Sequence, residues 1–255
     1  MTTTTATRRG GDQATVLPPL KLVRTFRENI ELMEGWLKRK GRGHALRILE
    51  AGCGNHWPLD LGGVEYALVG VDVDARALEI RKRSARPGDE IRYGDLRNRD
   101  LFGAAHFDAI YNSFVLEHVD GAERVLENFA HWLAPGGLLI LRIPDRDSVF
   151  GFVARTTPFW CHVLYKKYAK GNKHAGKPGF DPYPTVYDRI VSRQGIHAFC
   201  RARGLVIRDE AGYTDYLPRG RIFGPLARGL VRTISALSLG RLDGRYNNLT
   251  LVIEK

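Results

Sequence analysis

The stretch that decides the fold is Arg47-Ile-Leu-Glu-Ala-Gly-Cys-Gly54, an apolar run that leads directly into two glycines two positions apart. Glycine has no Cβ, so its backbone can approach a ligand closely, and a helix after such a turn presents its free N–H groups there. The third glycine of the usual dinucleotide-binding pattern, expected near Trp57, is missing. The stretch therefore predicts a strand followed by a ligand-binding turn, and it weakens the case for a nicotinamide oxidoreductase.

Short apolar runs and helical stretches alternate after this strand. Further strands are predicted over residues 67–72, 91–95, 107–113 and 138–145. Strands separated by helices imply right-handed crossovers and a mostly parallel sheet. Near the end of the chain we expect a helix over 192–203, a strand over 205–213, an amphipathic helix over 222–239, and a strand over 247–255. The predicted fold class is α/β, with a doubly wound, mostly parallel, seven-stranded Rossmann-like sheet and helices on both faces.

The domain organisation follows from length and composition. With 255 residues, 44% of them hydrophobic, the chain can bury the core of one large domain. Residues 1–19 are rich in threonine, glycine and proline, which is typical of a flexible tail. Residues 20–40 have apolar side chains at helical spacing, and we assign residues 20–255 to one domain. The stretch 146–186 breaks the alternation after the fifth strand, so we expect a substrate-side insertion or lid.

Charge, cysteines and apolar runs restrict the classes of function. A net charge of +11 is compatible with RNA, anionic lipid or an acidic substrate, and does not choose among them. We expect the basic runs 81–86 and 201–204 to be solvated helix faces. The three cysteines lack C-x-x-C spacing, so neither a disulfide framework nor a zinc site is suggested. Without a signal-like or membrane-spanning apolar run, the expected location is the cytoplasm.

Acidic side chains stand at the ends of the first three predicted strands. Glu50 precedes the first glycine, where a carboxylate suits a cationic or hydrogen-bond-donating ligand better than a phosphate. Asp72 ends the second strand, where it can accept both hydroxyls of a ribose, and Asp95 ends the third, where an exocyclic amine of adenine would fall. Asp74 is more simply the cap of the next helix. We expect the three strand-end carboxylates to converge on one crevice.

Together these features resemble the class I S-adenosylmethionine-dependent methyltransferases. The matching segments are Glu50–Gly54, Asp72, Gly94-Asp95, residues 107–118 and residues 133–137. The resemblance covers residues 45–145 well and the remainder only in its strand pattern. It implies S-adenosylmethionine as the cofactor, with the methionine part on the first loop, the ribose on Asp72, and the adenine beside Asp95 and Leu96. The full set of implied cofactor contacts is Glu50, Gly52, Cys53, Gly54, Asn55, Asp72, Val73, Asp95, Leu96 and Asn112.

The resemblance also implies the type of reaction. Methyl transfer from a sulfonium is a direct in-line displacement, which depends on orientation and on exclusion of water. Asn112 and Ser113 would line the methyl-transfer face after the fourth strand. That strand end lacks the Asn-Pro-Pro-aromatic signature of the amino-directed nucleic-acid enzymes, so DNA is not expected as a partner. We expect a small-molecule acceptor, methylated on oxygen rather than on nitrogen or carbon.

His118, in the segment Leu116-Glu117-His118, has two possible roles. An imidazole can take the proton of a phenol or hydroxyl near neutral pH, which would make His118 a catalytic base. Alternatively it is a histidine fixed on the helix after the fourth strand, since Leu-Glu-His-Val occurs in family members with unlike substrates. Some relatives bind a metal through Glu-x-x-Glu-His, but Phe114 stands at the first Glu position, so no metal is expected.

The candidate acceptor-binding side chains come from the insertion and its end. They are Tyr165, His174, Tyr183 and Tyr187. The tyrosines would form an aromatic wall for a flat or sugar-like acceptor, or would only pack the insertion down. His174 lies in a Lys- and Gly-rich stretch that also reads as a solvated loop. The alternative function is an RNA- or membrane-surface-binding protein that retains the methyltransferase fold, favoured by the net charge and the basic amphipathic segment 222–239.

Overall fold

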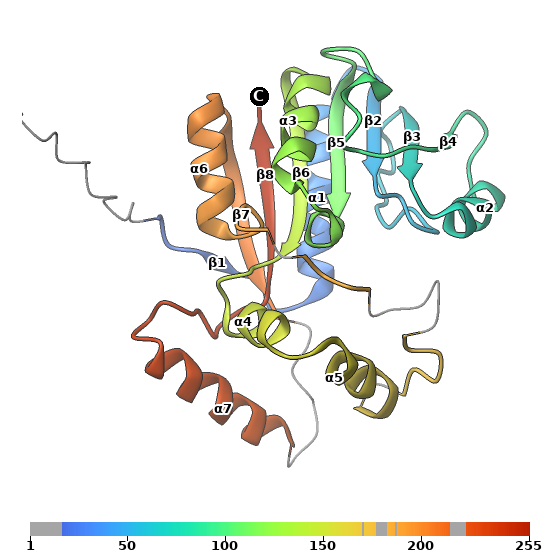
Figure 1. The fold of residues 1–255 in the computed structure, drawn as a ribbon. Coiled ribbons are helices and arrows are strands. Elements are labelled where there is room, and N and C mark those ends of the chain that lie inside the picture. The colour runs from blue at the N-terminus through green and yellow to red at the C-terminus, as the bar shows by residue number, and fades with distance from the viewer. Residues whose placement is uncertain (1–16, 170, 177–182, 187, 215–222) are drawn as a thin grey trace, which may run out of the picture.

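The computed structural model describes residues 17–169, 171–176, 183–186, 188–214 and 223–255. These residues build one eight-stranded sheet with the strand order β1-β7-β8-β6-β5-β2-β3-β4 (Figure 1). Its parallel part consists of β2 (Leu46–Ala51), β3 (Tyr66–Asp72), β4 (Glu90–Tyr93), β5 (Phe107–Ser113) and β6 (Leu133–Pro144). The predicted alternation of strands and helices is thereby confirmed.

The two last strands extend the sheet beyond β6. β8 (Asn248–Glu254) lies antiparallel between β6 and β7 (Val206–Tyr213). An eighth strand, β1 (Lys21–Leu22), pairs parallel with β7 at the edge, so the sheet has one strand more than the seven predicted. A two-residue strand leaves no periodic pattern in a sequence, and only its pairing with Ala211 and Gly212 defines it.

The first long helix starts later than predicted. Lys21 and Leu22 belong to the sheet edge, and α1 covers Phe26–Lys40. The Thr25 hydroxyl caps the helix by accepting from the N–H of Glu28, which sets its beginning. The apolar spacing from Leu20 onward therefore describes two different elements.

The other helices of the sheet layers are close to the prediction. They are α2 (Ala75–Arg83), α3 (Ala122–Trp132) and α6 (Arg193–Arg203), with short turns η1 (Arg99–Leu101) and η2 (Leu116–His118). Asp74 caps α2, as predicted, by accepting from the N–H groups of Arg76 and Ala77. Gly204 ends α6 in a left-handed conformation with φ of 68°.

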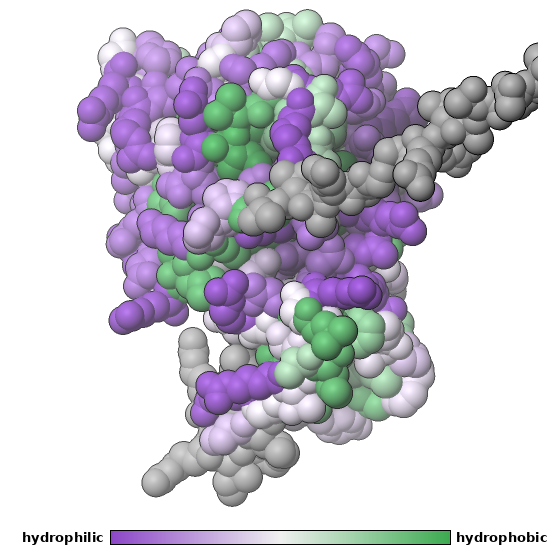
Figure 2. All heavy atoms as spheres, turned by 90° about the vertical axis from the view of Figure 1, so that its left-hand side faces the viewer, coloured by the Kyte–Doolittle hydropathy of each residue, from purple (hydrophilic) through white to green (hydrophobic). Residues whose placement is uncertain are grey.

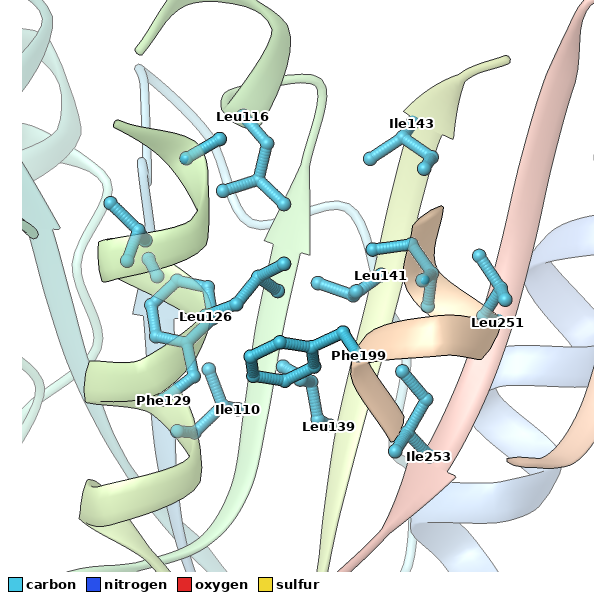
Figure 3. Close-up of a cluster of buried hydrophobic side chains, with 14 of the residues drawn as sticks. Ile110, Leu116, Leu126, Phe129, Leu139, Leu141, Ile143, Phe199, Leu251 and Ile253 are labelled. Atoms are coloured by element: carbon cyan, nitrogen blue, oxygen red, sulfur yellow. The ribbon is translucent and has the colours of Figure 1, made fainter. Parts of the chain in front are cut away.

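Hydrophobic layers cover both faces of the sheet. On one face, Phe129 of α3 and Phe199 of α6 pack over Leu139 and Leu141 of β6 (Figure 3). On the other face, α1 supplies Met33 and Leu37, which are fully buried against the sheet. Because helices cover both faces of the sheet, the sequences of the central strands are almost continuously apolar.

A third group of helices lies beyond the carboxyl ends of the parallel strands, at the bottom of Figure 1. It comprises α4 (Val149–Thr156), α5 (Phe159–Leu164), η3 (Tyr165–Ala169) and α7 (Phe223–Leu237). The helix predicted over 222–239 is confirmed as α7, which packs against α4 and not on a face of the sheet. Leu230 and Leu237 of α7 are 60% and 78% exposed. No helix in the described part of the chain combines the length and apolar character of a membrane span.

Candidate active site

The glycine loop after β2 is tied to the end of β3. The N–H groups of Gly52 and Cys53 both donate to the carbonyl of Val71, at 2.8 and 3.0 Å. The next N–H, that of Gly54, donates to Oδ2 of Asp72 at 2.8 Å. The end of β3 therefore holds three successive backbone positions of the predicted cofactor loop.

The two glycines of this loop have different roles. Both have positive φ, 75° at Gly52 and 53° at Gly54, which favours glycine. A Cβ at Gly52 would lie 2.2 Å from Cγ2 of Val115, so this glycine is needed for packing against the loop after β5. A Cβ at Gly54 would meet no atom within 4 Å. The open backbone at Gly54 fits the close approach of a ligand that the sequence predicts.

The carboxylates of Asp72 and Asp95 stand at neighbouring strand ends, as predicted. Oδ1 of Asp72 accepts from the N–H of Asp74 at 2.9 Å, and the N–H of Gly94 donates to the carbonyl of Asp72 at 3.0 Å. Asp95 is held by the Arg97 guanidinium, with the closest contact at 2.7 Å, and this partner lowers the pKa of Asp95. Contact of either carboxylate with the cofactor stays a prediction.

Glu50 is engaged differently from the other two carboxylates. It is buried with 3% exposure and accepts from Nη2 of Arg81 in α2 at 3.2 Å. Burial raises the pKa of Glu50 to about 8, and the Arg81 guanidinium opposes that rise. Arg81 is itself 2% exposed, so the expectation that the basic run 81–86 is a solvated face is wrong at its first residue. The reason is that α2 lies against β3 and β4 on the face to which Glu50 points.

Asn112, the penultimate residue of β5, has a side-chain oxygen without a partner among the described residues. Its side chain is fully buried, and Nδ2 donates to the carbonyl of Ala51 at 2.8 Å. Oδ1 of Asn112 has no hydrogen-bond partner among the described residues. Of the other predicted cofactor residues, Leu96 is buried while Val73 is 57% exposed, and the Asn55 side chain contacts His56. A buried acceptor beside the glycine loop fits a ligand that donates hydrogen bonds.

His118 lies where the insertion folds back onto the loop after β5. Nδ1 of His118 donates to the carbonyl of Pro184 at 2.8 Å, because a carbonyl oxygen only accepts. This bond leaves Nε2 as the basic nitrogen, 3.9 Å from Oε1 of Glu117. The Tyr183 ring stands edge-on to the imidazole at 5.9 Å. Burial lowers the pKa of His118.

The predicted acceptor residues are spread along the insertion. Tyr183 lies beside His118. Tyr165 opens η3 and is 38% exposed, and His174 is an exposed residue whose N–H donates to Oδ1 of Asn172 at 3.0 Å. Tyr187 lies outside the described residues. Acceptor binding by these four side chains stays a prediction.

Two buried ionisable groups near the site had no role in the sequence-based prediction. Glu117 is 4% exposed, and burial raises its pKa to about 8. Arg142, near the end of β6, is 5% exposed and donates to Oγ of Ser113 at 3.2 Å. The sequence did indicate that Arg142 is buried, because it is the single arginine in the otherwise apolar run 138–143.

Comparison with known proteins agrees with this geometry. A family model for a methyltransferase domain matches residues 21–210. An S-adenosyl-L-methionine-dependent Diels–Alderase of Talaromyces variabilis is 32% identical over 130 residues, 48% of this chain and 44% of that protein. A dTDP-4-amino-2,3,4,6-tetradeoxy-D-glucose N,N-dimethyltransferase of Saccharopolyspora spinosa is 28% identical over 204 residues, 73% of this chain and 77% of that protein. The matched segment thus spans less than half of the first relative and about three quarters of the second.

Among solved structures, the magnesium protoporphyrin IX methyltransferase of Synechocystis PCC 6803 with bound SAH shares the fold. Its TM-score is 0.53 at 14% identity, over 90% of this chain and 83% of that chain. The family model covers more than half of the chain. The chain belongs to the methyltransferase domain family and is a class I S-adenosylmethionine-dependent methyltransferase.

Proposed function

We propose that this methyltransferase transfers a methyl group to a hydroxyl oxygen of a small-molecule acceptor. The acceptor would bind between the loop after β5 and the insertion 146–186. The observation that carries the proposal is the hydrogen bond from Nδ1 of His118 to the Pro184 carbonyl, which presents Nε2 as a base beside the insertion.

The residues that would hold the cofactor are the ones at the strand ends. Gly54 offers open backbone, Asp72 and Asp95 offer carboxylates for the ribose and the adenine amine, and Asn112 offers a buried acceptor. When bound, S-adenosylmethionine supplies an electrophilic methyl group on a sulfonium. The protein's task is then to orient the acceptor and to exclude water.

His118 would manage the proton of the acceptor. As the hydroxyl oxygen bonds to the methyl carbon, its proton would pass to Nε2 of His118. The lowered pKa keeps the imidazole neutral, and able to accept that proton, at physiological pH. General base catalysis of this kind contributes roughly a hundredfold to ten-thousandfold in rate.

The N,N-dimethyltransferase relative makes nitrogen the alternative acceptor atom, and one experiment decides between them. A metabolite extract is incubated with methyl-labelled cofactor, and each labelled product is identified by mass spectrometry. We expect a labelled methyl ether, whose formation falls at least about a hundredfold in His118→Gln while SAH affinity is unchanged. A labelled amine would contradict oxygen transfer, and full activity of His118→Gln would remove the base assignment.

A specific observation also favours contact with an anionic membrane surface. Figure 2 shows hydrophobic residues beside hydrophilic ones on the lower part of the molecule, where α7 lies. Leu230 and Leu237 of α7 are largely exposed, and Arg228 and Arg232 are on the same helix. Leu230 and Leu237, seven positions apart, share one face of α7, and an exposed apolar helix face of this kind suits a membrane surface, while the net charge of +11 favours an anionic one.

Vesicle co-sedimentation tests this second candidate function. The protein should pellet with vesicles of phosphatidylglycerol and phosphatidylcholine, but not with phosphatidylcholine alone, and added salt should weaken binding. Leu230→Ser with Leu237→Ser should reduce the bound fraction. Equal recovery with both vesicle types, or unchanged binding of the double variant, would contradict membrane contact by α7.

A further inference from the structure

Arg142 is a buried cation at the ligand-binding edge of the sheet. It lies near the end of β6, and its register partners are Ser113 of β5 and Thr250 of β8. Its exposure is 5%, and a guanidinium keeps its charge at any physiological pH. A charge this deeply buried ordinarily has a countercharge.

The partners of Arg142 are all neutral. Its guanidinium donates to the hydroxyls of Tyr213 at 2.6 Å, Ser113 at 3.2 Å and Tyr111 at 3.4 Å. It forms no ion pair with a carboxylate of the described residues, and its Nε has no hydrogen-bond partner there. Arg81, the other deeply buried arginine at this end of the sheet, has the carboxylate of Glu50. Within the described part of the chain, Arg142 is thus held in place by neutral hydroxyls and meets no carboxylate.

Further polar groups without partners occur on the same side of the sheet. Thr250 of β8 is the cross-strand neighbour of Arg142 of β6. Core residues of β6 and β8 alternate between the two faces of the sheet, and this alternation puts both Arg142 and Thr250 on the face covered by α1. Oγ1 of Thr250 has no described partner, and neither polar atom of the Asn29 side chain has one. Asn29 follows Phe26 by one turn of α1, and the Phe26 ring lies 5.2 Å from the Arg142 guanidinium. One cation and two neutral donors therefore belong to elements that meet on this face of the sheet, a set that suits a carboxylate or a phosphate.

This region adjoins the proposed acceptor site. Phe114 donates its N–H to the carbonyl of Arg142 at 2.8 Å, and its ring lies 4.8 Å from the guanidinium. Phe114 starts the loop that carries His118, and it has a φ of 56°, a conformation that is uncommon for residues other than glycine. The Phe26 ring, which also contacts the guanidinium, is 55% exposed. If the Phe26 ring moved aside, a ligand could reach the Arg142 guanidinium from solvent.

We propose that Arg142 binds an anionic group, a carboxylate or a phosphate, of the methyl acceptor. The inference rests on the proposed function and adds the substrate class to it. The anion would displace the Phe26 ring and receive charge-assisted hydrogen bonds from the guanidinium, while the hydroxyl to be methylated would lie toward His118. Tyr213 and Ser113 would fix the guanidinium for this contact.

The test measures binding of small probes to the SAH-saturated protein by calorimetry. Benzoate and benzamide have nearly the same shape and differ in charge, and inorganic phosphate supplies the second anion. We expect benzoate or phosphate to bind at least about tenfold more tightly than benzamide, the effect of one charge-assisted hydrogen bond. Whichever anion binds more tightly identifies the acceptor group as carboxylate or phosphate.

Variants assign the effect to Arg142. Arg142→Met should abolish the preference for the anion, Arg142→Lys should keep part of it, and the surface control Arg203→Met should keep all of it. If Arg142→Met does not fold, Tyr213→Phe removes the 2.6 Å contact to the guanidinium and should still weaken anion binding several-fold. Equal binding of benzoate and benzamide with no phosphate binding, or an anion preference that survives in folded Arg142→Met, would overturn the proposal. Failure of the wild type to bind SAH at the start would instead contradict the proposed function.

Discussion

The carboxylate of Asp72 accepts a hydrogen bond from the backbone N–H of Gly54 at 2.8 Å, which joins the end of β3 to the glycine loop after β2. Oδ1 of the same carboxylate accepts from the N–H of Asp74 at 2.9 Å. One side chain therefore shapes the loop on which the cofactor is expected and also stands at the start of α2. Removal of Asp72 should affect ligand binding and loop order together.

Asp72→Ala should lower SAH affinity by at least about tenfold, because it removes both the ribose acceptor and the partner of Gly54. Asp74→Ala is the matched control, since it removes only the cap of α2. That variant should cost about 1 kcal/mol in the free energy of unfolding and leave SAH affinity nearly unchanged. Calorimetric titration and chemical denaturation measure the two effects. Wild-type affinity in Asp72→Ala would refute the ribose assignment.

Alanine substitution should separate the two glycines of the loop. Gly54→Ala should cost roughly 1–2 kcal/mol in stability for its left-handed backbone and should weaken SAH binding through the new methyl group. Gly52→Ala should destabilise more, because its Cβ would lie 2.2 Å from Val115. The double variant Gly52→Ala with Val115→Ala should recover part of that loss. Equal stability of the two single variants would contradict the packing role of Gly52.

Substituting Glu50 or Arg81 alone should lower the stability of the protein mainly by removing the contact between these two side chains. Arg81→Met leaves the buried Glu50 carboxyl, which with a pKa of about 8 is largely protonated at neutral pH, without its partner and should lower the free energy of unfolding by about 1–3 kcal/mol. The double variant Glu50→Leu with Arg81→Met should recover much of this loss. Denaturant titration of the single and double variants measures the coupling. Additive losses would show that the two side chains act independently.

Glu117 should make the protein less stable as pH rises. Its folded-state pKa of about 8 lies above the unfolded value of about 4.3, so the folded state holds the proton more tightly. The resulting stability is fully present below the unfolded pKa and is lost as pH rises through about 8. Glu117→Gln should therefore gain stability relative to wild type between neutral pH and mildly alkaline pH. Parallel stability profiles for the two proteins would contradict the raised pKa.

The sheet and its cofactor loop could be predicted from local sequence because their signals are local. Residues 107–113 were predicted as a strand with the observed bounds, and the cap at Asp74 was recognised from its residue type. The two-residue β1 could not be predicted, since only pairing with a strand about 190 positions later creates it. The packing partner of α7 could not be predicted for a related reason, because amphipathic spacing shows that a helix has a partner but not which one.

The ionisable groups of the site were the hardest to predict. Arg81 lies in a run of basic residues and looked solvated, yet it is buried by its contact with Glu50, 31 positions earlier. The bond from His118 to the Pro184 carbonyl also joins segments that are far apart in the sequence. Such contacts depend on how β5 and the insertion meet in space, which no residue spacing reports.

Calorimetric titration of the purified protein with SAH, set against the oxidised nicotinamide dinucleotide, tests the central claim most directly. The account predicts one saturable SAH site and no heat of binding for the dinucleotide. Binding of the dinucleotide with no response to SAH would show that the glycine loop and the strand-end carboxylates hold a different cofactor.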